Sequence, residues 1–174
     1  MTNSLSRRNF LASSAVLAAV AGCRQSASSP WDFLTSRMAV TLGALCDQIV
    51  PADDFPSASQ AGVLIYIDHQ LARVYARYQQ DYRRGLELAE GMARSTYGRG
   101  VEELTVEQQL AWAGKIEHDD QGFFKLVREH AMEGYYGAPR HGGNKDAVSW
   151  HMLGLDEPPV RGRAQYNPKK EGAL

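Results

Sequence analysis

The chain has few of the residues that hold redox groups. Its 174 residues include only two cysteines, Cys23 and Cys46. A covalent c-type haem needs Cys-x-x-Cys-His and an iron–sulfur cluster needs several cysteine ligands, so the sequence excludes both. A dinucleotide site needs Gly-x-Gly-x-x-Gly between a strand and a helix, and residues 98–101 lack both the third glycine and a strand pattern. We therefore expect no cofactor in this chain.

Metal-ligand clusters and nucleophile motifs are missing as well. The chain has five histidines: His69, His118, His130, His141 and His151. None belongs to a His-x-x-x-His pair or to a carboxylate cluster with ligand spacing, and no Gly-x-Ser-x-Gly motif occurs. We expect His69 and His130 to cap helix surfaces or to bond to carbonyl groups. Asp53 and Asp54 are typical of a solvated turn rather than a cation site. We predict no metal site and no catalytic residue.

An excess of charge of one sign is also absent. The chain has 19 basic and 20 acidic residues, a formal net charge of −1. Nucleic-acid binding usually needs a clear basic excess, so we expect no nucleic-acid partner.

The N-terminal segment has the layout of an export signal. Arg7 and Arg8 precede an apolar run of twelve residues that starts at Phe10 and ends in small residues. A membrane-spanning helix needs roughly 20 residues, so we expect residues 1–22 to be removed rather than kept as an anchor. Arg7, Arg8, Phe10 and Leu11 resemble the twin-arginine motif that the Tat translocase reads. A Sec-type leader is the alternative, because any leader carries positive charge at this place.

Two interpretations of Cys23 stay open. The preceding Val-Ala-Gly resembles a lipobox, in which Cys23 becomes the lipidated first residue, but an ordinary cleavage site would also fit. Both interpretations place the chain on the periplasmic side of the inner membrane, with a lipid anchor only in the first. Cys46 lies in an apolar helical pattern and is predicted to be a buried, unreactive thiol.

Beyond the leader, the sequence predicts an all-α protein. Residues 23–35 are polar and serine-containing at their start, as in a tether, and residues 36–137 follow as a helical domain. No segment alternates apolar and polar residues over the length of a strand. Apolar residues recur at helical spacing in five segments: 36–50, from about 58 to 75, from about 80 to 97, 106–117 and 121–136.

Several of the predicted helix ends carry a local stop or start signal. Pro51 ends the first helix, and a break near residues 77–80 separates the second from the third. Thr105 and Gln108 fit a capping box at the start of the fourth. Residues 137–139, Gly-Ala-Pro, end the fifth.

The segment 138–174 is predicted to be irregular, because glycine, proline and asparagine are frequent in it. It cannot form a core of its own, so we expect it to lie on the helical body, on a partner, or across both. Glycines permit a tight turn, Trp150 offers a large apolar face, and arginine and tyrosine are favoured at interfaces. The predicted partner interface comprises His141, Gly142, Gly143, Asn144, Trp150, Arg161, Arg163 and Tyr166.

Three stretches, residues 49–58, 61–71 and 133–154, resemble the gluconate 2-dehydrogenase subunit 3 (gamma or small subunit) family. The resemblance implies that the chain functions in a complex with a large FAD-binding flavoprotein and a multihaem cytochrome c subunit. It implies that FAD and haem c belong to those partners and that the small subunit carries no cofactor. It also implies that the small subunit stabilises the flavoprotein and takes it through Tat on its own signal.

We therefore interpret the chain as a non-catalytic accessory subunit of a membrane-associated, flavin-dependent sugar or alcohol oxidoreductase. One alternative is a stand-alone periplasmic lipoprotein that binds a ligand or acts as a scaffold, which predicts a sizeable apolar pocket with convergent polar groups. Another is a hydrolase that uses Asp54, His141 or His151, which predicts that these side chains converge in one cleft.

Overall fold

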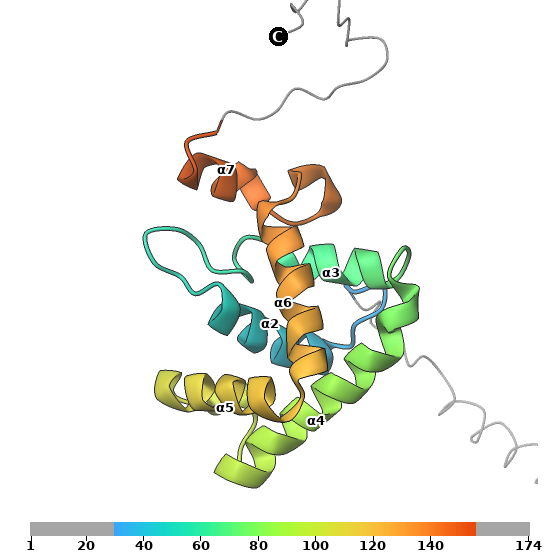
Figure 1. Ribbon diagram of the computed structural model, residues 1–174, viewed down its shortest axis with the longest axis vertical. Helices are drawn as coiled ribbons and strands as arrows, with labels where there is room; N and C mark the ends of the chain where they lie inside the picture. The colour runs from blue at the N-terminus through green and yellow to red at the C-terminus, as the bar shows by residue number, and fades with distance from the viewer. Residues whose placement is uncertain (1–29, 156–174) are drawn as a thin grey trace, which may run out of the picture. The chain divides into compact units, whose positions relative to one another are not determined.

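The computed structural model describes residues 30–155, and over this range it contains helices and no strand (Figure 1). The α-helices are α2 (Ser36–Ile49), α3 (Val63–Leu71), α4 (Gln79–Tyr97), α5 (Val106–Asp119), α6 (Gln121–Tyr136) and α7 (Val148–Met152). Short 3-10 helices are η1 (Ala76–Tyr78), η2 (Val101–Glu103), η3 (Pro139–His141) and η4 (Lys145–Ala147). The predicted all-α class is confirmed.

Part of the sequence-based prediction falls outside these residues. This applies to Arg7, Arg8, Phe10, Leu11, Cys23, Arg161, Arg163 and Tyr166. Within residues 30–155, no helix is long and apolar enough to cross a membrane.

Most helix bounds agree with the periodicity. α6 has the predicted bounds, α2 ends one residue before the predicted end, and η1 occupies the predicted break. The capping box of α5 is present, since the Thr105 side chain accepts from Gln108 N and the Gln108 side chain accepts from Thr105 N. Local sequence therefore determines these helix ends.

The predicted start of the second helix is wrong, because α3 begins at Val63 rather than near Ala58. The Asp47 carboxylate accepts hydrogen bonds from Ser59 N, at 2.8 Å, and from Ser59 Oγ, at 2.6 Å. Gly62 then adopts a left-handed conformation, with φ of 80°, immediately before the helix. Contacts distant in sequence therefore hold residues 57–62 in turns and delay the helix.

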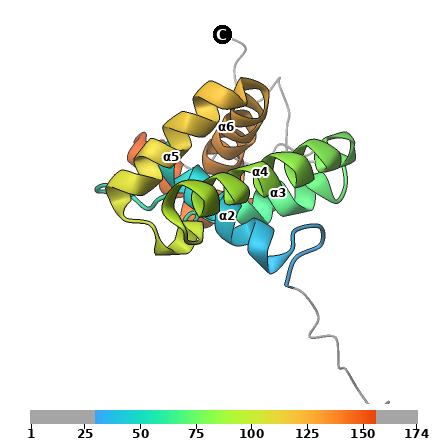
Figure 2. The same cartoon turned by 90° about the horizontal axis from the view of Figure 1, so that it is seen from below.

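The core lies where α2 meets the helices around it. α2 contacts α3, α4, α5 and α6, and Figures 1 and 2 show it enclosed by them. Its side chains Leu42, Leu45 and Cys46 are fully buried. The predicted burial of Cys46 is confirmed, and this burial raises the pKa of its thiol. The indole N–H of Trp112, on α5, donates to Ala89 O at 2.8 Å and so ties α5 to α4.

A buried carboxylate fixes the chain just before α2. Asp68, on α3, is 2% exposed and accepts backbone hydrogen bonds from Asp32, Phe33 and Leu34 at 2.7 to 2.9 Å. These three residues lie in the predicted tether, 23–35. The structure instead attaches this part of it to the helical body.

Candidate partner interface

The glycine pair after α6 folds back onto the helical body. Gly142 has φ of 102°, and a Cβ atom there would lie 3.0 Å from Cγ2 of Ile65, on α3. A Cβ atom on Gly143 would lie 2.1 Å from the carbonyl oxygen of Gly134, on α6. A side chain at Gly143 would force the backbone to shift, and the left-handed φ of Gly142 favours glycine there. The predicted turn at this place therefore closes against the chain's own helices.

Asn144 is fully buried and joins α6 to α7. Its Nδ2 donates to Gly137 O at 2.8 Å, and its Oδ1 accepts from Ser149 N at 2.9 Å. Its φ of 48° is left-handed, a conformation that asparagine tolerates better than most residues. Gly143 and Asn144 thus have intramolecular roles in the structure, and their predicted contact with a partner stays a prediction.

His141 and Trp150 remain accessible. His141 is exposed, and Trp150 is half-buried with its indole N–H donating to Tyr136 O at 3.0 Å. The segment after α6 was expected to lie on the helical body, on a partner, or across both. The structure shows residues 139–155 on the helical body. Contact of His141 and Trp150 with a partner stays a prediction.

The three stretches that carry the family resemblance meet at this turn. Lys145 N donates to Ala61 O at 2.9 Å, and the hydroxyl group of Tyr135 donates to Pro56 O at 2.8 Å. A hollow of about 350 Å³ lies beside these contacts. It is lined by Pro56, Gln60, Ala61, Lys145, Asp146, Val148 and His151. Charged and polar side chains thus share the hollow with small apolar ones.

The predicted turn at Asp53 is confirmed. Asp53 Oδ1 accepts from Phe55 N at 2.8 Å, and both Asp53 and Asp54 are exposed. Of the three side chains considered for a hydrolase, His151 lines the hollow, whereas Asp54 and His141 do not. In the described part of the chain, no group of three or more His, Cys, Asp or Glu residues could hold a metal ion.

A buried aromatic cluster surrounds His130 and is not among the sequence-based predictions. This imidazole, on α6, is 4% exposed, and its Nδ1 lies 2.9 Å from the hydroxyl oxygen of Tyr82. Its ring stacks on Tyr75 and on Tyr82, with centroid distances of 4.5 and 5.8 Å. Burial lowers the pKa of His130. The prediction that His130 caps a surface or bonds to a carbonyl is therefore wrong.

One signal in the sequence could have located His130 correctly. It lies seven residues after Phe123 and three after Val127, which places it on the apolar side of the predicted helix. Both of those residues are buried in the structure.

Comparison with known proteins assigns the family. The family model described as Gluconate 2-dehydrogenase subunit 3 matches residues 37–156, more than half of the chain. The match begins within α2 and extends past α7, so it includes the turn and the hollow described above. None of the curated proteins and none of the solved structures matches. The chain belongs to the gluconate 2-dehydrogenase subunit 3 family.

Proposed function

We propose that this chain is the non-catalytic small subunit of a membrane-associated, flavin-dependent oxidoreductase similar to gluconate 2-dehydrogenase. The match to the subunit 3 family carries this proposal. The family's description makes the chain an accessory subunit of an oxidoreductase complex. Substrate oxidation then takes place on a large FAD-binding subunit, and a multihaem cytochrome c subunit, which holds haem c, accepts the electrons.

Within the complex, the chain's work is binding and export. A subunit that binds the folded flavoprotein and not the unfolded one stabilises it by mass action. Arg7, Arg8, Phe10 and Leu11 support a role as Tat signal for the pair of proteins, and Cys23 supports a lipid anchor at the periplasmic face. The fixed turn after α6 supports binding, because a rigid surface loses little entropy when a partner docks.

Co-expression tests both parts of the proposal. The companion flavoprotein would be expressed with the intact chain, with the R7K/R8K variant, or alone. We expect flavin-dependent reduction of a membrane-impermeant dye by intact cells, which reports activity on the periplasmic face of the inner membrane, only with the intact chain. The R24K variant is the matched control, because Arg24 lies outside the predicted motif and outside residues 1–22.

Two results would contradict the proposal separately. Equal export of the flavoprotein with the R7K/R8K variant would remove the Tat role. Equal stability and export of the flavoprotein without this chain would remove the accessory role as a whole.

A further inference from the structure

One side of α6 presents a stripe of residues spaced four apart. The α6 stripe consists of Phe124, Arg128, Met132 and Tyr136. Helical positions four apart lie one above the other on one side of the helix. Arg128 is exposed, Met132 is 41% exposed and Tyr136 is 37% exposed, while Phe124 is half-buried against the core.

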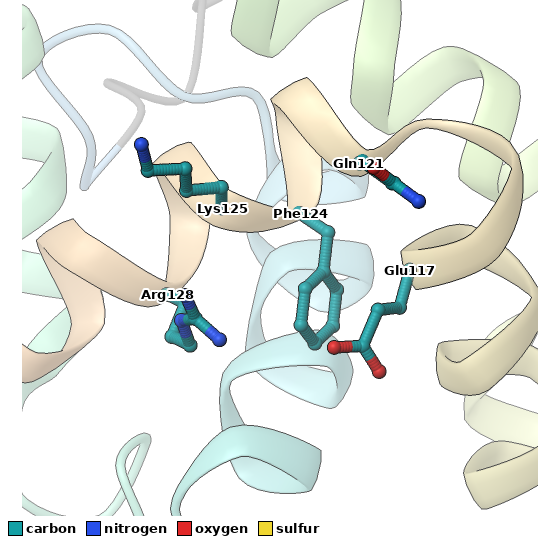
Figure 3. Close-up of a pocket in the computed structure, with 5 residues that line it drawn as sticks. All are labelled: Glu117, Gln121, Phe124, Lys125 and Arg128. Atoms are coloured by element: carbon teal, nitrogen blue, oxygen red, sulfur yellow. The ribbon is translucent and has the colours of Figure 1, made fainter.

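A hollow lies at the N-terminal end of the α6 stripe. Figure 3 shows the ring of Phe124 pointing into it, with Glu117 of α5 on one side and Arg128 on the other. Gln121 and Lys125 complete the lining, and the volume is about 250 Å³. This end of the stripe is therefore a concave place with an aromatic wall.

The C-terminal end of the stripe continues beyond the helix. Trp150 donates its indole N–H to the carbonyl oxygen of Tyr136, so its ring lies next to the last residue of the stripe. Leu153, which follows α7, is 55% exposed, and its backbone N–H donates to Ser149 O and Trp150 O. The apolar surface thus extends from the stripe onto the segment that follows α6.

The composition of the stripe distinguishes it from other exposed apolar residues. Phenylalanine, arginine, methionine, tyrosine and tryptophan are the types enriched at the centres of protein interfaces. Among the described residues, the large apolar side chains exposed elsewhere are aliphatic, such as Ile65, Val74 and Leu88, and Val106 and Leu110 on α5. Valine and leucine are under-represented among the residues that dominate binding energy, and single exposed ones are ordinary.

The charge of the stripe indicates what it binds. Over residues 30–155, no carboxylate lies within ion-pair distance of Arg128, whereas its neighbour Lys125 lies 3.8 Å from Glu129. Arg128 sits between Phe124 and Met132 in the stripe, so a docked surface would shield it from water. A guanidinium shielded from water needs a hydrogen-bond acceptor, and a carboxylate, which it can bind with two parallel hydrogen bonds, is the strongest one that a protein side chain offers.

We infer that the α6 stripe docks the companion flavoprotein, at a place where that protein presents a carboxylate flanked by apolar side chains, with Arg128 bound to that carboxylate. This inference rests on the proposed accessory function and adds the surface through which it acts. Phe124, Met132, Tyr136 and Trp150 supply the apolar contact. Arg128 sets the register of the two proteins.

Site-specific cross-linking in the native complex tests the inference. A photoreactive phenylalanine analogue would replace Met132 in the full chain, or Leu110 as the control, since Leu110 is an exposed apolar residue on α5. We expect a cross-link from position 132 to the flavoprotein, in a peptide that contains Asp or Glu. We expect none from position 110. A cross-link from position 132 to the cytochrome subunit instead would contradict the inference.

Charge reversal tests the role of Arg128 itself. We expect R128E to weaken binding of the purified companion at least tenfold, and R128K to weaken it less because lysine keeps the charge. The R99E variant is the control, because Arg99 is exposed in the connection between α4 and η2. Unchanged helical circular dichroism of each full-length variant would show that folding is intact.

The outcomes separate this inference from the proposed function. If the companion binds but cross-links at position 110 and not at 132, the inference fails and the accessory function stands. A cross-link from position 132 to a second copy of this chain, or to lipid, also overturns the inference. If no flavoprotein or cytochrome accompanies the chain, the proposed function fails and the inference fails with it.

Discussion

Asn144 combines a left-handed backbone with two buried hydrogen bonds, and each can be tested by its own substitution. N144A removes both side-chain hydrogen bonds. It also puts alanine, which tolerates a left-handed backbone conformation less well than asparagine, at a position with φ of 48°. N144G removes the same bonds but accepts this φ. We expect N144A to lower the free energy of unfolding by about 3 kcal/mol, and N144G by about 1 kcal/mol less than that. Denaturant titration measures both, and equal losses would show that the backbone conformation contributes nothing.

His130 makes the stability of the chain depend on pH. Because burial lowers its pKa, the folded state favours neutral imidazole, whereas an unfolded histidine titrates near about 6.5. Below that pH the unfolded state binds more protons, so stability falls as pH drops toward the lower folded pKa and is retained above about pH 7. Glu133 and Glu129 oppose the lowering, while Arg77 adds to it.

The H130F variant should lose this part of the pH dependence. Thermal midpoints measured from about pH 5 to about pH 7.5 should fall less steeply on acidification than those of the intact chain. H118F is the matched control, because the His118 side chain is 85% exposed. An unchanged slope for H130F would contradict the assignment.

We expect replacement by alanine to have opposite effects on stability at two glycines of α4, Gly85 and Gly91. A Cβ atom on Gly85 would lie 2.3 Å from the ring of Phe123, on α6, whereas one on Gly91 would meet nothing within 4 Å. G91A should raise the free energy of unfolding by about 0.5–1 kcal/mol, because alanine is the better helix former. G85A should lower it by about 1–3 kcal/mol, because the ring must move. If both variants were stabilised in denaturant titrations, α4 and α6 would not be packed this closely.

The long helices could be predicted because the information for them is local. α4, α5 and α6 each span at least 14 residues, so the apolar periodicity is clear. Thr105 and Gln108 cap α5 from within four residues of sequence. For such elements the sequence pattern and the tertiary contacts agree.

The start of α3 and the whole of α7 could not be predicted in the same way. Residues 57–62 are held by Asp47 and by the approach of Gly62 to Gly142, which lie far apart in sequence. α7 has five residues, too few for periodicity, and its first turn is fixed by Asn144. Tertiary contacts determine both elements.

At the scale of the whole molecule, the three stretches that resemble the family are separate in sequence but lie together in the fold. Residues 49–58 and 61–71 meet residues 133–154 through the Tyr135–Pro56 and Lys145–Ala61 hydrogen bonds. The sequence could identify the stretches, because their residue types are distinctive. It could not show that Gly143 and Asn144 face inward, since only the packing of α3 on α6 decides that.

An accessory subunit should stabilise its companion in proportion to its concentration. If this chain binds only the folded flavoprotein, a free concentration of 100 times Kd adds about 2.7 kcal/mol to the flavoprotein's free energy of unfolding. The temperature of flavin release should therefore rise with each increment of added chain and continue to rise logarithmically above Kd.

An M132E variant should lose this effect, because a carboxylate in the α6 stripe would repel the carboxylate that we infer on the companion. An L110E variant should keep it, since Leu110 lies on α5. A flavin-release temperature that does not change with added chain would mean that binding, if it occurs, does not distinguish folded from unfolded flavoprotein.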